Sequence, residues 1–429
     1  VSARDRELIE TSLAGAREYG ADAAVLDWLG SVILPPQNEA QREFALRWQQ
    51  FSAPVMAKGL EDTAFYNYHR LISTCEVGAD PRHAICSIDD FHARMIDRQQ
   101  SWAATMNASS THDTKRAEDV RARINVLSEL SGEWLELVQR WQEWHRPFKR
   151  ELEGLDTPDA IDELLLYQTL VGAWPLAEDE LPGFGERIRN YMLKAVREAK
   201  RRTSWRAQNP EYEKAVTDFT DAVLDPENHR FHEDLPTLLH KTDFYGALNA
   251  LSQLVIKLGA PGVPDFYQGN ELWSLALVDP DNRRPVDFDR RRSALEDLDL
   301  DGAKRNWRDG RIKALITARG LAVRNQMPDL FAAGEYKPVK VTGPRARNLI
   351  AFERRLEGQR VLVIAARFFS ELTTPAVWPI ADIWTGTTLE VSGQKWVDVL
   401  SKTTIDAGAA LPVGHVLQTL PLAILTGGS

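Results

Sequence analysis

Residues 109–123 read SSTHDTKRAEDVRAR and decide how the fold is interpreted. The segment just before them, residues 102–109, is uncharged and mostly compatible with a strand. A short apolar run followed at once by His, Asp, Lys and Arg is typical of a buried parallel strand that ends in a reactive loop, because α/β sheets carry their chemistry at the carboxyl ends of strands. The loop offers the Asp113 carboxylate beside the His112 imidazole, with cations close enough to keep the carboxylate ionised.

The composition is that of an ordinary globular protein with an acidic balance. The 429 residues are enough for two or three domains, and 43% of them are hydrophobic and 27% charged. The formal net charge of −10 argues against a nucleic-acid partner, whose phosphates the protein would repel. The longest apolar run, residues 25–34, is broken by Asp27 and Gly30 and is too short to cross a membrane. Cys75 and Cys86 have neither metal-site nor disulfide spacing, and no signal peptide is visible, so we expect a cytoplasmic protein.

Three short apolar runs, each followed by polar residues, predict buried parallel strands that end in loops. These runs are residues 54–58, 102–110 and 262–269. Three such strands cannot close a barrel, and an open parallel sheet would leave unpaired edges. We therefore expect part of the catalytic unit to lie N-terminal to Val1.

Helical periodicity fills most of the chain up to about residue 320. Residues 1–50, 115–235 and 242–258 carry apolar side chains three or four positions apart, which predicts amphipathic or buried helices. After residue 320, short alternating runs predict antiparallel strands, with Glu357-Gly358 as a hairpin turn. The expected class is α/β, closed by a small all-β domain.

His112 and Asp113 are the first candidates for chemistry. An ionised Asp113 can accept hydrogen bonds from sugar hydroxyls and stabilise positive charge that develops on a sugar ring, with His112 on a neighbouring hydroxyl. The structural alternative is that Thr111 or Asp113 caps a helix beginning near Lys115. The position directly after a strand favours the functional interpretation.

Residues 56–66, MAKGLEDTAFY, supply the second set of candidates. Lys58, Glu61 and Asp62 are suited to bind a polyhydroxylated substrate, and Tyr66 is suited to stack on it. The alternative is a capping box at the start of the next helix, with the aromatic rings in the core. The residues themselves leave both alternatives open.

The third predicted strand is followed by Gln268, which we expect to contact substrate at the same rim, whereas Asp265 is interpreted as structural. The Asp-rich segment DPDNRRPVD, residues 279–287, lacks the Gly and the terminal Glu of an EF-hand loop, so no calcium site is predicted. The chain contains no phosphate-binding loop, nucleophile elbow or zinc-protease motif.

The chain resembles the maltooligosyl trehalose synthases. These enzymes belong to the α-amylase superfamily, glycoside hydrolase family 13. The resemblance is carried by residues 51–66, residues 110–123, and residues 261–271 together with 279–287. The first two segments are distinctive for this family, and the third is shared more widely in the superfamily. The resemblance extends over nearly the whole chain but covers only the C-terminal part of the family's enzyme.

The resemblance implies a fold: the C-terminal part of a (β/α)8 TIM barrel with a large helical insertion, followed by a small all-β domain. The implied division is residues 1–50 as a helical segment entering the barrel, 51–114 as barrel strands and rim loops, 115–235 as the insertion, 236–319 as the last barrel strand and helices, and 320–429 as a C-terminal β-sandwich domain.

The resemblance also implies an activity. Family members convert the reducing-end α-1,4 linkage of a maltooligosaccharide to an α,α-1,1 linkage, with no metal or organic cofactor. They use a nucleophile, a general acid/base and a third carboxylate that stabilises the transition state. Asp113 would be the third carboxylate and His112 its substrate-binding neighbour. The other two would lie before Val1 in the missing N-terminal half of the barrel, so the chain alone is predicted to be inactive.

The polar rim residues would hold the released glucose until it is transferred: Lys58, Glu61, Asp62 and Lys115. Retaining that glucose and excluding water decides isomerisation over hydrolysis. Two other functions stay open. One is a non-catalytic glucan-binding protein that kept the fold, and the other is a related α-glucan hydrolase or glucanotransferase.

Overall fold

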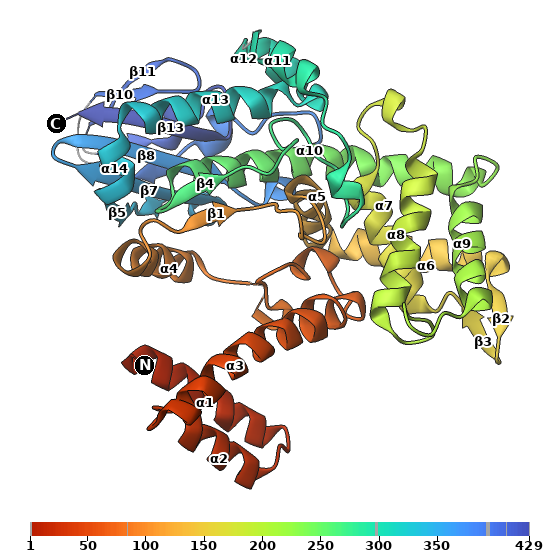
Figure 1. Ribbon diagram of the computed structural model, residues 1–429. Coiled ribbons are helices and arrows are strands. Elements are labelled where there is room, and N and C mark those ends of the chain that lie inside the picture. The colour runs from red at the N-terminus through yellow and green to blue at the C-terminus, as the bar shows by residue number, and fades with distance from the viewer. Residues whose placement is uncertain (1, 84, 297–298, 392–394, 409, 429) are drawn as a thin grey trace. The chain divides into compact units, whose positions relative to one another are not determined.

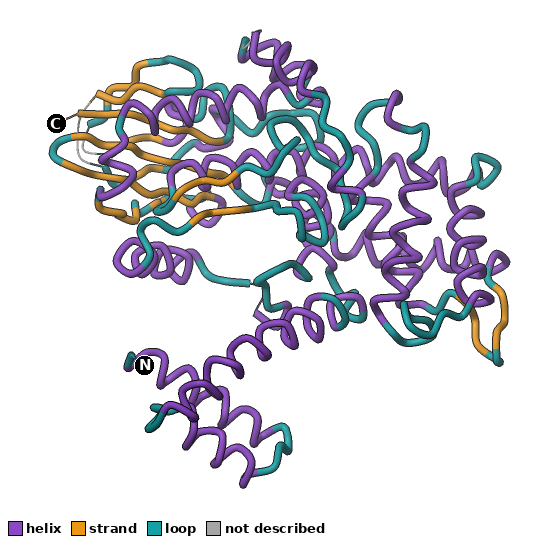
Figure 2. The backbone as a smooth tube through the Cα atoms, viewed as in Figure 1, coloured by secondary structure: helices purple, strands orange, loops and turns teal. Residues whose placement is uncertain are grey.

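The computed structural model describes residues 2–83, 85–296, 299–391, 395–408 and 410–428. It divides into two compact units, Val1–Tyr66 and Asn67–Ser429 (Figure 1). The described strands all belong to the second unit, and helices make up most of the regular structure in both (Figure 2). No helix within the described ranges combines the length and the apolar character needed to cross a bilayer.

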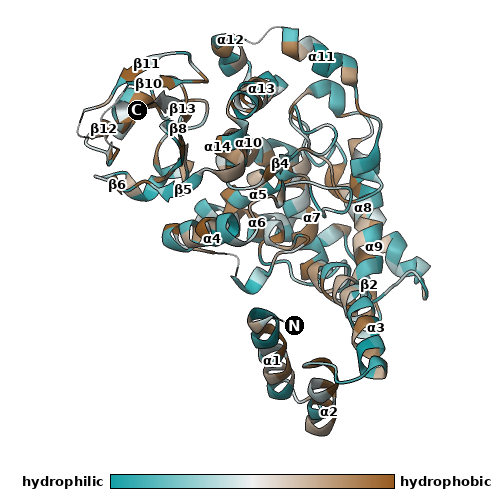
Figure 3. Cartoon of the chain, turned by 60° about the vertical axis from the view of Figure 1, so that its left-hand side comes forward, coloured by the Kyte–Doolittle hydropathy of each residue, from teal (hydrophilic) through white to brown (hydrophobic). Residues whose placement is uncertain are grey.

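The first unit is helical. Asn38 caps its longest helix by accepting a hydrogen bond from the backbone N–H of Gln41 at 2.9 Å. Hydrophobic and polar residues alternate along that helix (Figure 3). The elements are α1 (Ala3–Glu18), α2 (Ala23–Ile33), α3 (Glu39–Met56) and the short turns Ala57–Glu61 and Ala64–Tyr66.

The prediction of a buried strand over residues 54–58 is wrong, because α3 and the turn that continues it occupy these residues. The aromatic and aliphatic residues from Phe44 to Val55 recur four, three and four positions apart, which is a helical period that runs past Pro54. A five-residue apolar run is compatible with either element, and the longer period decides between them. Residues 51–66 therefore belong with the helices of the first unit and contain no barrel strand.

The second unit is built around one long helix, α10 (His229–Gly259), which packs on α5 (Glu118–Glu129). A Cβ atom at Gly246 would lie 2.8 Å from the Arg123 Cα, so glycine is needed for this close approach. The other helices are α4 (Ile88–Ser101), α6 (Ser131–His145), α7 (Ala160–Ala173), α8 (Phe184–Ala199), α9 (Pro210–Leu224), α11 (Phe288–Glu296), α12 (Leu300–Arg305), α13 (Arg311–Gln326), α14 (Pro328–Ala333) and α15 (Val413–Val416). The predicted helical content of residues 115–235 is confirmed, although a small hairpin of β2 (Arg150–Leu152) and β3 (Leu155–Thr157) was not predicted.

Two short strands lie within the predicted runs 102–110 and 262–269. They are β1 (Met106–Ala108) and β4 (Val263–Asp265), and they pair in parallel. Their parallel pairing agrees with the prediction, but their burial does not, because Met106 is 66% exposed and Val263 is 48% exposed. Among the described residues these two strands form a sheet of their own, and no barrel is present.

The C-terminal part is β-rich, as predicted, and its strand pairs are antiparallel. Glu357 and Gly358 form the predicted hairpin turn with φ values of 46° and 85°, the left-handed region that glycine enters without strain. One sheet has the order β11-β10-β13-β8-β7-β5 and the other β12-β9-β6; α10 packs on the first of them, at β8 and β13 (Figure 1). The strands are β5 (Glu335–Pro338), β6 (Val341–Thr342), β7 (Leu349–Leu356), β8 (Gln359–Ala366), β9 (Thr388–Leu389), β10 (Lys395–Asp398), β11 (Thr404–Asp406), β12 (Leu411–Pro412) and β13 (Leu422–Gly428).

A buried polar chain links α6 and α7. The His145 Nδ1 lies 2.7 Å from the Tyr167 hydroxyl, which donates to the Glu163 carboxylate at 2.7 Å. The Asn228 side-chain nitrogen lies 3.0 Å from the His145 Nε2. Because the Tyr167 hydroxyl proton is directed at Glu163, His145 donates through Nδ1 and accepts at Nε2 as a neutral imidazole. Burial, with positive charge nearby, lowers the pKa of His145 to about 4.

Acidification is therefore expected to destabilise this region through His145. The pKa of the imidazole is ordinarily 6.5 and is about 4 in the fold, so between these values the unfolded chain binds the proton more strongly. The stabilisation is present above pH 6.5 and is lost as the pH falls toward 4, by on the order of 2–3 kcal/mol. Thermal midpoints of the wild type and of His145→Gln, measured near pH ~4.5 and ~8, check this. The midpoint of the wild type should fall further between the two conditions, and equal falls would contradict the assignment.

Candidate functional site

The loop that carries His112 and Asp113 connects the carboxyl end of β1 to α5. The helix begins at Glu118, and its N-cap residue Ala117 supplies no side-chain cap. Neither Thr111 nor Asp113 therefore caps the helix, and the structural alternative for these residues is wrong. The Asp113 side chain lies on a turn and is 50% exposed, so a ligand can reach its carboxylate.

Lys115 lies beneath Asp113. Its ammonium nitrogen is 3.7 Å from Asp113 Oδ1, and its side chain is only 2% exposed. A buried cation supplies positive charge next to the carboxylate without facing solvent itself. This placement suits a supporting role toward Asp113 better than direct contact with a substrate, so the predicted substrate contact of Lys115 stays a prediction.

His112 is exposed, and its backbone is held by the Asp-rich segment of residues 279–287. The His112 carbonyl oxygen accepts hydrogen bonds from the Asn282 side chain at 3.1 Å and from the Arg283 guanidinium at 3.4 Å. The sequence analysis predicted no calcium site in that segment and assigned it no contact with the Asp113 loop, and the structure shows that it fixes the tip of this loop.

A cavity of about 530 Å³ adjoins this arrangement. Asn282 lines it while also bonding His112, and Gln268, exposed after β4, lines it from the other strand. Gln268 and Asn282, which bonds the His112 backbone, thus line the same cavity. The cavity wall is rich in charged and polar groups, which suits a polyhydroxylated ligand. These include Arg187, Glu180, Asp281, Arg284, Asp287, Arg290 and Arg291.

The remaining predicted residues belong to the first unit. Lys58 forms an ion pair with Asp62 across one helical turn. Glu61, the residue before Asp62, is partly buried. Tyr66 is 3% exposed, which agrees with the alternative that its ring is a core residue. The binding roles of Lys58, Glu61, Asp62 and Tyr66 stay predictions.

Glu76 anchors the far end of the Asp113 loop, and sequence reasoning missed it. Its two carboxylate oxygens accept hydrogen bonds from the backbone N–H groups of Lys115 at 2.8 Å and Arg116 at 3.1 Å. The Arg116 guanidinium, itself buried, donates to the Ile72 carbonyl at 3.1 Å and so ties the loop to the same segment a second time. No local sequence pattern points to Glu76, because its partners lie about 40 positions away in the chain.

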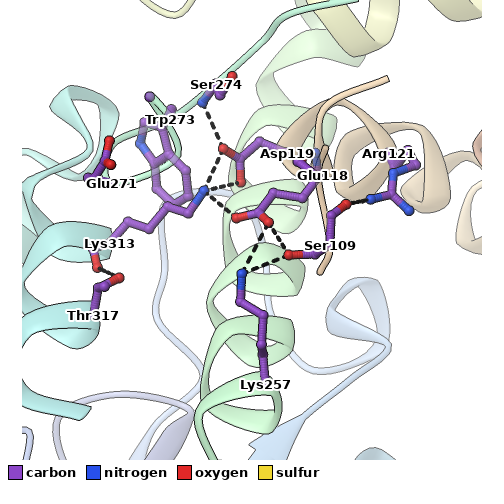
Figure 4. Close-up of polar contacts among 12 residues, drawn as sticks. Ser109, Glu118, Asp119, Arg121, Lys257, Glu271, Trp273, Ser274, Lys313 and Thr317 are labelled. Carbon is purple, nitrogen blue, oxygen red and sulfur yellow. Dashed lines mark hydrogen bonds and ion pairs between the residues drawn. The ribbon is translucent and has the colours of Figure 1, made fainter. Parts of the chain in front are cut away.

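A buried charged cluster holds the near end of the loop (Figure 4). Lys313 on α13 lies 2.8 Å from a carboxylate oxygen of Glu118 and 2.8 Å from one of Asp119. Burial opposes the charge on Lys313, but the two carboxylates outweigh it and raise the pKa of Lys313. Burial also opposes the charge on Glu118, yet Lys313 and Lys257 together lower the pKa of Glu118 to about 2. Two lysines and two carboxylates are thus buried together, and for the other two members burial is the largest effect: it raises the pKa of Asp119 and lowers the pKa of Lys257.

Lys257 extends this cluster to Ser109 (Figure 4) and also to the last residue of β4. Its ammonium group donates to the Ser109 hydroxyl at 2.7 Å and to the Asp265 carbonyl oxygen at 3.1 Å. Ser109 directly follows β1, and Asp265 is the last residue of β4. Lys257 thus links the carboxyl ends of the two strands from which the Asp113 and Gln268 loops leave.

Comparison with known proteins gives a consistent result, although no family model matches the chain. Two curated relatives from Mycobacterium tuberculosis, strains CDC 1551 / Oshkosh and ATCC 25618 / H37Rv, are provisionally named maltooligosyl trehalose synthase. Each is 35% identical over 383 residues, which are 89% of this chain and 45% of the relative. The structure of maltooligosyltrehalose synthase from Arthrobacter ramosus matches with a TM-score of 0.79 and 36% identity, over 98% of this chain and 51% of that one.

A further crystal structure of a maltooligosyl trehalose synthase matches with a TM-score of 0.74 and 31% identity, over 99% of this chain and 55% of that one. The agreement thus holds for both sequence and structure, and it extends over almost all of this chain. The chain is homologous to the maltooligosyl trehalose synthases and spans about half of their length.

Proposed function

We propose that the chain supplies one of the three catalytic carboxylates and part of the substrate site of a maltooligosyl trehalose synthase. Asp113 stabilises the positive charge of the transition state, His112 binds a neighbouring sugar hydroxyl, and Gln268 contacts the glucan at the cavity. The observation that carries the proposal is the half-exposed Asp113 carboxylate in the loop that follows a parallel strand, next to His112, whose backbone is bonded by the cavity residue Asn282. Homology to the family supports the same assignment.

The chemistry needs two further carboxylates. In retaining glycosyl transfer one attacks the anomeric carbon, while the other protonates the departing oxygen and later deprotonates the acceptor. These two groups stand about 5–5.5 Å apart across the sugar. We assign them to polypeptide outside this chain, which would also complete a (β/α)8 barrel around β1 and β4.

The proposed acceptor is the anomeric hydroxyl of the glucose released in the first step. Its attack on the glycosyl-enzyme intermediate converts the α-1,4 linkage at the reducing end to an α,α-1,1 linkage. Asp113 accepts hydrogen bonds from the ring hydroxyls of the sugar and offsets the charge that develops on it in both steps. Lys115, buried beneath Asp113, adds the positive charge that complements this carboxylate.

The test compares the chain alone with a joined enzyme, defined as this chain fused to the part of the Arthrobacter ramosus synthase that it does not cover. Both are incubated with maltopentaose. We expect the joined enzyme to remove reducing ends without releasing glucose, and the chain alone to leave the sugar unchanged. Release of glucose would indicate a hydrolase, and binding of the sugar without reaction would indicate a non-catalytic glucan-binding protein.

The residues proposed to retain the released glucose allow a finer test in the joined enzyme. Alanine at Lys58, Glu61, Asp62 or Lys115 is expected to raise the ratio of hydrolysis to transfer several-fold, because water then competes for the intermediate. The ratio is obtained from glucose release and loss of reducing ends in the same reaction. An unchanged ratio removes that residue from the set. Arg292→Ala, at an exposed position of α11, serves as the control.

A further inference from the structure

We propose that Glu76 is a positioning residue for Asp113: its buried carboxylate fixes the backbone two and three residues after the catalytic side chain. This inference rests on the proposed function of Asp113. It assigns a role to a residue that lies outside the strands, the cavity and the segments that carry the family resemblance.

Both oxygens of the Glu76 carboxylate are fully engaged. Oε1 accepts from the backbone N–H groups of Lys115 and Val77, each at 2.8 Å. Oε2 accepts from the N–H of Arg116 at 3.1 Å and lies 3.6 Å from the Arg121 guanidinium. Glu76 is 4% exposed, so these protein groups replace the water that the charge would otherwise bind.

The position of Asp113 depends on how the two ends of its loop are attached to the rest of the molecule. At one end Lys257 holds Ser109 next to β1. At the tip, the His112 carbonyl oxygen accepts from Asn282 and Arg283, and the Asp113 backbone N–H donates to the Thr111 hydroxyl at 3.2 Å within the loop. Glu76 attaches the other end. A displacement of about 1 Å at a catalytic group can cost on the order of 10²-fold in rate, so the position of this anchor matters for Asp113.

Glu76→Gln is the variant that isolates this role. Glutamine keeps the size of the side chain but replaces one acceptor oxygen with an NH₂ group, which would face a backbone N–H and repel it. In the joined enzyme we expect kcat for maltooligosyl trehalose formation to fall about 10- to 100-fold. KM should change less than about threefold, because Glu76 does not touch the substrate.

A double variant separates positioning from general structural damage. If Glu76 acts through Asp113, then Glu76→Gln added to Asp113→Asn should lower kcat no further than Asp113→Asn alone. A purely structural defect would add its own loss. Glu163→Gln is the matched control, since Glu163 is equally buried and charge-paired but lies in α7, away from the loop. It should reduce stability and leave kcat unchanged.

The outcomes distinguish this inference from the proposed function. Full activity of Asp113→Asn would overturn the function assigned to Asp113, whatever Glu76→Gln does. A strong loss with Asp113→Asn, together with normal kcat for Glu76→Gln or an additive double variant, would overturn the positioning role alone. Amide exchange gives an independent readout in this chain without activity. The N–H groups of Lys115 and Arg116 should exchange faster in Glu76→Gln, and unchanged exchange would also overturn the inference.

Discussion

Asp113→Asn is expected to lower kcat of the joined enzyme by about 10³-fold, with little change in KM. Asparagine has the same shape and can still accept a hydrogen bond from a sugar hydroxyl, but it carries no charge to offset the charge of the transition state. Loss of one preorganised electrostatic group at a reacting centre typically costs about 10²–10³-fold in rate. The substrate ground state carries no such charge, so the loss should appear in kcat and not in binding.

Stability provides the control for this experiment. Because the Asp113 side chain is 50% exposed, Asp113→Asn should shift the free energy of unfolding by less than about 0.5 kcal/mol. Initial rates with maltopentaose and thermal midpoints should be measured on the same preparations. An active Asp113→Asn variant with an unchanged midpoint would remove Asp113 from the reaction.

Lys313→Met is expected to produce the largest loss of stability among the substitutions considered. The Lys313 side chain is 0% exposed and forms ion pairs with both Glu118 and Asp119. Its removal leaves buried carboxylates without their cation, and breaking a buried ion pair from one side costs about 3–5 kcal/mol. Denaturant midpoints of the full chain measure the effect.

Two further variants test the cause of this loss. Adding Asp119→Asn to Lys313→Met should recover part of the stability, because Lys257 and Glu118 then remain as a buried pair. Arg292→Met removes one partner of an exposed ion pair with Asp289 and should leave the midpoint unchanged. If Lys313→Met behaved like Arg292→Met, the cluster would not stabilise the fold.

Local periodicity predicts local structure well in this chain. The helices of residues 115–235, the hairpin turn at Glu357-Gly358 and the strand positions of β1 and β4 all follow from short-range patterns. The strand expected at residues 54–58 fails because a short apolar run carries too little information to separate strand from helix.

The partners of the candidate site could not be predicted in this way. Lys115 meets Glu76 across 39 positions, and Asp119 meets Lys313 across 194. Such pairs depend on how segments pack in three dimensions, and neither residue carries a local pattern that names the other. The loop that holds Asp113 was therefore visible in the sequence, whereas the groups that hold the loop were not.

The length of α10 has a mechanical consequence. This single helix has 31 residues and is about 46 Å long at a rise of 1.5 Å per residue. Near its beginning, Phe231 packs against Trp141 of α6. In its last turns, Lys257 bonds Ser109 after β1 and Asp265 at the end of β4. A movement of the helices that pack on the beginning of α10 would therefore be transmitted along one continuous helix to Lys257. Pro236 lies inside α10 and cannot donate a backbone hydrogen bond, so we expect any bending of the helix to occur near this residue.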